Sequence, residues 1–236
     1  MATKTPLIAF LFALLTIFSI SCDTEDPGPL QEDRKDFPII DFDRLEMGSG
    51  LNIKVEQSNT YGIQVRGDRR NVDDLEVYKS GSTLIVKFED NNNRKHQTYI
   101  TITMPRLEAV NFSGACVSKV TGFQSDDDIE FILSGASVAQ LDADYDEVNV
   151  SLSGASSLAM SGAGDQIHAD VSGASVLTAF DYLVREADIT VAGASSGKIN
   201  VDEQLRAKAS GASSLLYRGN PSVTSEVSGA SVVQKD

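Results

Sequence analysis

The amino-acid sequence predicts an all-β protein whose main part is a parallel β-helix, or β-solenoid, with about 18–21 residues per turn. The first observation is a motif of the Ser-Gly-Ala-Ser type that recurs seven times between residues 113 and 231, with glycines 21, 19, 19, 20, 18 and 18 residues apart. The second is an alternation of apolar and polar residues beside each motif, which is the period of a β-strand with one buried face. A unit this short cannot bury its own apolar face, so successive units must stack around one core.

Each repeat is predicted to consist of a strand, a corner and a second strand. The position two residues before the glycine is apolar in every copy, and the position three before it is polar in six of the seven copies. The apolar column consists of Phe112, Leu133, Leu152, Val171, Val191, Ala209 and Val227. Apolar residues resume after the motif, for example at Leu158 and Met160. With strands of adjacent turns about 4.8 Å apart, the intervals between the motifs extend the solenoid by roughly 29 Å.

The motif itself is predicted to form the corner of each turn. Identical small residues then lie over one another, and glycine adopts backbone angles that other residues resist. Cys116 takes the fourth motif position, which is serine in the other six copies. Because the two side chains have nearly equal volumes, we expect Cys116 to be a packed, unreactive thiol instead of a catalytic or metal-binding one.

Residues 38–110 are expected to form irregular first turns that cap the solenoid, ahead of the regular turns of residues 111–236. Four segments in this part alternate as strands do, and loops lie between them. The four segments are Leu51–Val55, Tyr61–Val65, Thr83–Phe88 and Tyr99–Met104. Residues 38–236 are therefore predicted to form one β-helix domain.

Residues 1–21 are predicted to be a cleaved signal peptide. An apolar run from Leu7 to Ile20 contains 14 residues, too few to span a bilayer, which needs about 20. The sequence Ser-Ile-Ser-Cys that ends at Cys22 resembles a bacterial lipobox and predicts lipid attachment at this cysteine, with ordinary secretion as the alternative. Residues 22–37 are mostly charged or chain-breaking, so we expect a flexible tether between the membrane and the domain.

Charge and composition exclude several classes of function. Removing the signal peptide removes one Lys and no acid, so 19 basic and 34 acidic residues remain and the net charge is −15. Such a chain repels nucleic acid, and no nucleic-acid partner is expected. No cofactor is expected, because the zinc, nucleotide and dinucleotide motifs are missing. Asp142, Asp144 and Asp146 lack the glycine and the closing glutamate of a calcium loop, so they and Asp126–Asp128 are interpreted as solvated acidic turns.

Three segments of the chain resemble the putative auto-transporter adhesin head GIN domain family, a domain of unknown function in Bacteroidetes. They are Leu51–Gln57, Ser82–Phe88 and Ile102–Glu108, the last of which leads into the first motif. The resemblance covers residues 40–236 and implies a right-handed β-helix, with no catalytic residues to carry over. Together with the lipobox it predicts a lipoprotein of the outer membrane or cell surface of a Gram-negative bacterium, with a periplasm-facing position left open.

The expected function is that of a non-catalytic adhesin or scaffold that binds a glycan or a protein through the solenoid surface. Columns repeated turn after turn suit an extended partner. Two such columns contain the candidate binding residues His168, Asp170, Asp188, Arg206 and Lys208. A purely structural interpretation pairs Asp188 with Arg206 and Lys208 with Glu226 between turns.

Two further expectations concern chemistry and assembly. The alternative function is cleavage of a polysaccharide, an activity suggested only by analogy with other β-helix proteins. No capping helix follows the last motif, and open sheet edges invite pairing, so either a homo-oligomer through the solenoid ends or a tightly folded tail at that end is expected.

Overall fold

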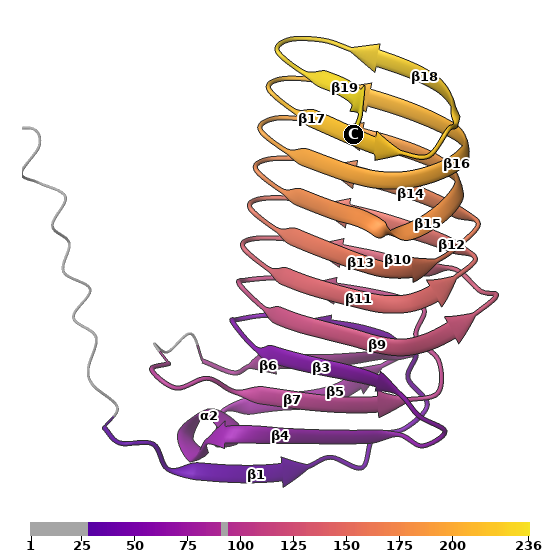
Figure 1. Cartoon of the computed structure of the whole chain (residues 1–236). Helices are drawn as coiled ribbons and strands as arrows, with labels where there is room; N and C mark the ends of the chain where they lie inside the picture. The colour runs from indigo at the N-terminus through magenta and orange to yellow at the C-terminus, as the bar shows by residue number, and fades with distance from the viewer. Residues whose placement is uncertain (1–27, 91–93) are drawn as a thin grey trace, which may run out of the picture.

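The computed structural model describes residues 28–90 and 94–236 and shows a β-solenoid of about 6 turns (Figure 1). The strands stack from an N-terminal base to the last, C-terminal turn at the opposite end (Figure 1). The predicted fold class is therefore confirmed. Cys22 and the predicted signal peptide lie outside the described residues.

Each regular turn has one strand before its Ser-Gly-Ala-Ser corner and one strand after it. Strands before the corners stack in parallel as the first face of the solenoid, and strands after the corners stack in parallel as the second face. The first face contains β8 (Ala109–Phe112), β10 (Ile129–Leu133), β12 (Glu147–Leu152), β14 (Gln166–Val171) and β18 (Ser222–Val227). The second face contains β9 (Val117–Ser125), β11 (Val138–Tyr145), β13 (Ser157–Ala163), β17 (Ser214–Arg218) and β19 (Val232–Lys235).

Two long strands belong to both faces. β15 (Val176–Val191) and β16 (Ser196–Ala209) each begin on the second face and end on the first face of the following turn. Along the strands before the last turn the buried side chains alternate with more exposed ones, as in β12, where Val148, Val150 and Leu152 are buried. In the last turn, all six residues of β18 are exposed. The buried side chains of both faces form one apolar core.

The glycine of each corner is required by the turn below it. The N–H of Ala155 donates to Gly135 O at 2.7 Å, and the same bond between turns recurs from Ala174 to Gly154 and at the three later corners. Gly154 has φ +75°, and a Cβ on this residue would lie 2.4 Å from Gly135 O. Any other residue would therefore adopt an unfavourable left-handed backbone and also push the two corners apart.

The fourth residue of each corner points into the core with a hydrogen-bonding group. Ser156 Oγ donates to Ser153 O at 2.9 Å, and the N–H of Ser156 donates to Ser175 Oγ in the next turn at 3.2 Å. Such serines are buried in five successive turns, at Ser137, Ser156, Ser175, Ser195 and Ser213. Cys116 occupies the same position and is also buried.

One turn of the solenoid has a tight corner without the motif. It consists of β2 (Arg44–Met47) and β3 (Asn52–Gln57), which pair in parallel with β8 and β9. Its corner contains two residues with positive φ, Ser49 at 65° and Gly50 at 72°. The same backbone is seen at the next corner, where Gly114 and Ala115 both have positive φ.

The order of the first turns in space differs from their order along the chain. The turn formed by β6 (Thr83–Phe88) and β7 (Tyr99–Met104) lies on the other side of β2 and β3, which are therefore enclosed between it and the first regular turn. The irregular first turns predicted over residues 38–110 thus include one turn with a tight corner and one whose corner is a longer loop.

Antiparallel strands and one short helix close the base. β4 (Gly62–Asp68) pairs with β7, and β5 (Leu75–Ser80) pairs with β6. α2 (Arg69–Asp73) follows β4 directly. The outermost strand is β1 (Glu32–Asp36), which pairs antiparallel with β4 (Figure 1).

β1 changes the extent of the tether that the sequence predicts over residues 22–37. Residues 32–36 are polar and carry no apolar stripe, yet they form a strand because the edge of β4 offers unpaired backbone groups. Residues 32–36 of the predicted tether are therefore part of the folded domain. Residues 22–27 lie outside the described residues.

Candidate functional surface

The five residues that the sequence selects lie together on the outward side of the first face. His168 and Asp170 come from β14, Asp188 from β15, and Arg206 and Lys208 from β16. Strand register aligns His168 with Asp188 and Asp188 with Arg206 in one column. Asp170 and Lys208 belong to the neighbouring column, where Thr190 separates them.

The two charge pairs expected between turns are aligned but do not form contacts. Asp188 faces Arg206 and Lys208 faces Glu226 in the register, yet neither pair forms an ion pair within 4.0 Å in the described structure. Arg206 instead donates to Gln204 Oε1 at 3.1 Å. These charged groups lie on the outward side of the solenoid without the direct ion pairs that the structural interpretation assumed.

The column of His168 continues toward the base, where sequence reasoning did not follow it. Register aligns His168 with Asn149 and Asn149 with Glu130. Asn149 and Glu130 line a groove of about 290 Å³ together with Arg44 and Glu108. Both added column residues occupy the same place as His168, five residues before a motif glycine, so the sequence does carry a signal for them.

Ion pairs hold the side chains of this groove in place. Arg44 Nη2 lies 3.4 Å from Glu108 Oε2, and Arg44 Nη1 lies 4.0 Å from Glu130 Oε2. Arg106 bridges Asp43 and Glu108 at 3.2 and 2.9 Å. The column and the groove together make a surface that we call the polar track, defined by Arg44, Glu130, Asn149, His168, Asp188 and Arg206 with Asp170 and Lys208 beside it.

The two edges of the solenoid differ in charge. The seven corner motifs form one edge and contain no charged residue. The opposite edge, where the second face returns to the first, carries many carboxylates and the two arginines Arg185 and Arg218. The acidic residues of this edge are Asp126, Asp127, Asp128, Asp142, Asp144, Asp146, Glu147, Asp165, Asp181, Glu186, Asp202 and Glu203. The polar track therefore runs between a neutral edge and an acidic one.

Carboxylates of the acidic edge form hydrogen bonds and ion pairs with groups of the neighbouring turns. Asp142 Oδ1 accepts from Ser161 Oγ at 3.2 Å, and Asp144 Oδ1 accepts from the N–H of Ala163 at 2.9 Å. Arg185 lies 2.7 Å from Asp165 and 3.0 Å from Glu203. Within the described ranges, no group of three or more His, Cys, Asp or Glu side chains is arranged to hold a metal ion.

Two tyrosines fill the core behind the acidic edge. Tyr145 Oη donates to Leu107 O at 3.0 Å, and Tyr182 Oη lies 3.4 Å from both the carbonyl and the N–H of Tyr145. Burial raises the pKa of Tyr182 to about 12 and raises the pKa of Tyr145 as well. Both hydroxyls therefore stay protonated and play a packing role.

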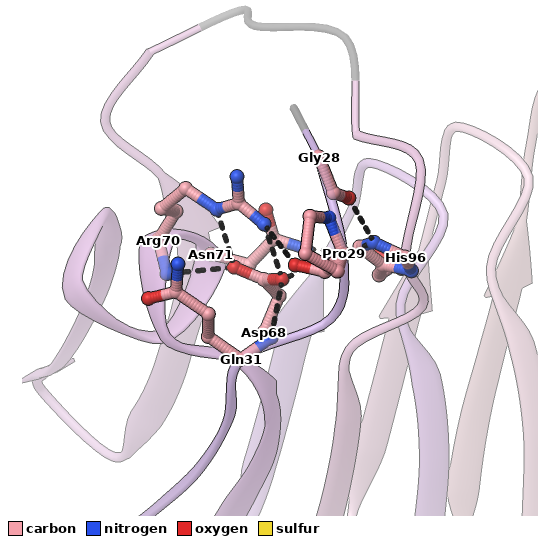
Figure 2. A network of polar contacts seen from close by, with 7 residues as sticks. All are labelled: Gly28, Pro29, Gln31, Asp68, Arg70, Asn71 and His96. Carbon is pink, nitrogen blue, oxygen red and sulfur yellow. Dashed lines mark hydrogen bonds and ion pairs between the residues drawn. The ribbon is translucent and has the colours of Figure 1, made fainter. Parts of the chain in front are cut away.

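A buried polar cluster at the base was not expected from the sequence (Figure 2). Its centre is Asp68 at the end of β4, whose side chain is 2% exposed. Asp68 Oδ1 accepts from the backbone N–H and from Nε of Arg70, at 3.0 and 2.7 Å. Asp68 Oδ2 accepts from Arg70 Nη2 at 2.7 Å and from the N–H of Gln31 at 3.1 Å.

The same cluster contacts the chain just before β1. Arg70 Nη2 also donates to Pro29 O at 3.1 Å, and His96 Nε2 lies 3.2 Å from Gly28 O (Figure 2). Asn71 Nδ2 in turn donates to the carbonyl of His96 at 2.9 Å. Segments that are about 40 residues apart along the chain thus meet at the carboxylate of Asp68.

Comparison with known proteins gives a family and a set of similar structures. The family model described as putative auto-transporter adhesin, head GIN domain, matches residues 41–221. A putative adhesin from Bacteroides fragilis is 20% identical, with a TM-score of 0.75 over 87% of this chain and 96% of that chain. A putative lipid binding protein from Parabacteroides distasonis is 17% identical, with a TM-score of 0.70 over 87% and 96% of the two chains.

A third similar structure is a putative adhesin from Parabacteroides merdae, which is 17% identical with a TM-score of 0.64, again over 87% of this chain and 96% of that chain. At these identities the likenesses show the fold alone. Comparison with curated proteins gives no match.

Proposed function

This chain belongs to the putative auto-transporter adhesin head GIN domain family, and we propose that it is a non-catalytic adhesin of the cell envelope that binds an extended partner along the polar track. The partner is a glycan or a protein segment. The observation that carries this proposal is a column of exposed polar side chains in register over successive turns, with a groove at one end. An extended ligand meets such a surface at several turns at once.

The chemistry of the polar track favours many weak contacts over one strong one. It offers carboxylates, guanidinium groups, an ammonium group, an amide and an imidazole from several turns, and register spaces successive turns by about 4.8 Å. The imidazole of His168 has a carboxylate close by, since Glu147 Oε1 at the start of β12 lies 3.9 Å from its Nε2. Such a series of donors and acceptors suits hydroxyl groups or backbone amides of an extended chain.

A glycan array is the direct test of the proposal. The purified protein is compared with an Asp188→Asn/Arg206→Gln double variant, and an Asp181→Asn/Arg218→Gln variant on the acidic edge is the matched control. We expect binding to at least one glycan class that the track variant loses by about tenfold or more and the edge variant keeps. Equal binding by both variants would contradict the polar track.

Activity assays test whether the protein is an enzyme that cleaves polysaccharides. Depolymerisation assays with neutral and acidic polysaccharides run beside the array. We expect no cleavage. Cleavage that Asp170→Asn or Asp188→Asn abolishes would overturn the non-catalytic assignment and establish the polysaccharide-cleaving alternative.

Attachment to the outer membrane or cell surface through lipid on Cys22 completes the proposal. Within the described residues, no helix is long and apolar enough to cross a membrane. Mass analysis and fractionation of Cys22→Ser test the anchor: the variant should lose both the acyl mass and its place in the membrane fraction. Retention of either in the variant would contradict lipid attachment at this residue.

A further inference from the structure

The first described residues are bound to the base of the solenoid at three levels. β1 pairs with β4 over five residues, from Glu32 with Asp68 to Asp36 with Gln64. The N–H of Arg69 donates to Gln31 O at 2.7 Å, which continues this pairing toward the N-terminus. The carbonyl of Pro29 then accepts from Arg70, and the carbonyl of Gly28 contacts His96.

Asp68 is the group on which these contacts converge. Hydrogen bonds from the Arg70 side chain hold the pKa of Asp68 well below its usual range, even though burial alone would raise it. A buried carboxylate is strongly destabilising without such donors, so the partners of Asp68 are strongly constrained in position. One of them is the N–H of Gln31, which belongs to the segment that precedes β1.

We infer that residues 28–36 form a strap, fastened by Asp68, that fixes the point at which the chain leaves the base toward its membrane anchor. The part of this inference that concerns the membrane rests on the proposed lipid attachment at Cys22. If the flexible tether extended from residue 22 to residue 37, the solenoid could take any orientation relative to the membrane. A strap that ends at Gly28 leaves only residues 22–27 between the lipid and the folded base.

The strap gives the rod a direction. β1 is the outermost strand of the base, and the strands stack from it in the order β4, β7, β3, β9, β11, β13, β15, β16 and β17. β14 belongs to the turn that contains the start of β15, seven positions from β1. The end of β16 belongs to the turn that contains β17, nine positions from β1. At about 4.8 Å per strand, His168 and Arg206 stand roughly 34 and 43 Å from the base. The base therefore faces the membrane, and the part of the polar track from His168 to Arg206 is presented away from it.

Trypsin tests the strap, because Arg34 and Lys35 lie in the middle of β1. The full chain is compared with Gln31→Pro, which removes the N–H that binds Asp68 and leaves the buried Asp68–Arg70 pair intact. Leu30→Pro is the matched control, since Leu30 is exposed and its N–H has no hydrogen-bond partner in the described structure. We expect cleavage after Arg34 or Lys35 to be about tenfold faster in Gln31→Pro than in the wild type or the control.

Asp68→Asn is the second variant, and hydrogen exchange is its readout. Amide exchange of residues 31–36 should accelerate, whereas that of β12 should not change, which separates release of the strap from general unfolding. Unchanged cleavage in Gln31→Pro together with unchanged exchange in Asp68→Asn would overturn the strap. Faster exchange throughout the chain would also count against it, because the cluster would then stabilise the whole fold.

Energy transfer to acceptor lipids tests the orientation. Fluorophores are placed on Lys79→Cys near the base or Thr224→Cys in the last turn, and the buried Cys116 gives no background. In vesicles carrying the lipidated full chain, a fluorophore at position 79 should transfer energy efficiently to the acceptor lipids. A fluorophore at position 224 should transfer much less. Equal transfer would overturn the orientation. Absence of both proteins from the vesicles would refute the anchor itself, while the trypsin result would still decide the strap.

Discussion

At the scale of single residues, each corner combines a glycine that approaches the turn below with a serine that bonds inside the core. A Cβ added at Gly154, or at the glycine of any later corner, would lie too close to the carbonyl oxygen of the glycine in the preceding corner. The hydroxyl of Ser156 donates to a carbonyl of its own turn, and the hydroxyl of Ser175 accepts from the N–H of Ser156 in the turn before it. The motif recurs because the same two steric and polar demands recur in every turn.

Gly154→Ala should lower stability more than its backbone angle alone explains. The φ of +75° costs an alanine about 1 kcal/mol, and the contact at 2.4 Å with Gly135 O adds to this. Gly81→Ala is the control, because Gly81 also has positive φ, 60°, but open space around its Cβ position. We expect a total loss of about 2–4 kcal/mol for Gly154→Ala and about 1 kcal/mol for Gly81→Ala in denaturant titrations. Equal losses would refute the steric account.

Cys116→Ser should be close to neutral. Burial raises the pKa of the Cys116 thiol, and backbone N–H groups of Leu51 and Gly50 donate toward its sulfur as they do toward serine oxygens in later turns. A hydroxyl can therefore replace it within about 1 kcal/mol. The wild-type thiol should react with Ellman's reagent only after unfolding. Rapid reaction of the folded protein would show that Cys116 is accessible.

At the scale of elements, the base depends on contacts that join distant parts of the chain. β1 has neither apolar alternation nor β-branched residues, and it is a strand because β4 provides the partner. Asp68 lies 37 residues from Gln31, and their hydrogen bond has no sequence signature. The turn of β2 and β3 also escaped the repeat pattern, since its corner reads Gly-Ser-Gly and is followed by Leu51 where later turns have serine or cysteine.

The stability of the base should decrease in acid because of Asp68. Its pKa is lowered in the folded state, whereas in the unfolded chain it returns to about 3.9. The stabilisation is therefore fully present above the unfolded pKa and is lost as pH falls below about 4 toward the folded value. Thermal midpoints of the wild type should fall more steeply below pH 4 than those of Asp68→Asn. Parallel curves for the two proteins would show that Asp68 does not contribute.

At the scale of the whole molecule, the two ends of the solenoid differ. The base is closed by a strand of charged residues, which is one way in which proteins protect a sheet edge. In the last described turn, Val223 and Val227 continue the inward column but are 38% and 49% exposed. The expected homo-oligomer through the solenoid ends stays a prediction, and these two residues are where it is best tested.

Val227→Asp should dissociate such an oligomer, because it places a charge on the apolar end. Thr224→Asp, on the outward side of the same strand, is the control that should leave it intact. Sedimentation equilibrium of the wild type and both variants gives the masses. A wild-type protein that remains monomeric at high concentration would contradict association through this end.

The sequence by itself determined the solenoid, its turn length and its buried columns, because a local pattern repeated seven times leaves one way to bury the apolar face. It also selected five of the residues of the polar track, since position relative to the glycine defines a column. The tertiary structure decided which charges actually touch, where the column meets a groove, and how β1 and Asp68 fasten the base. These depend on side-chain reach and on contacts between residues far apart in sequence, and neither leaves a periodic trace in the chain.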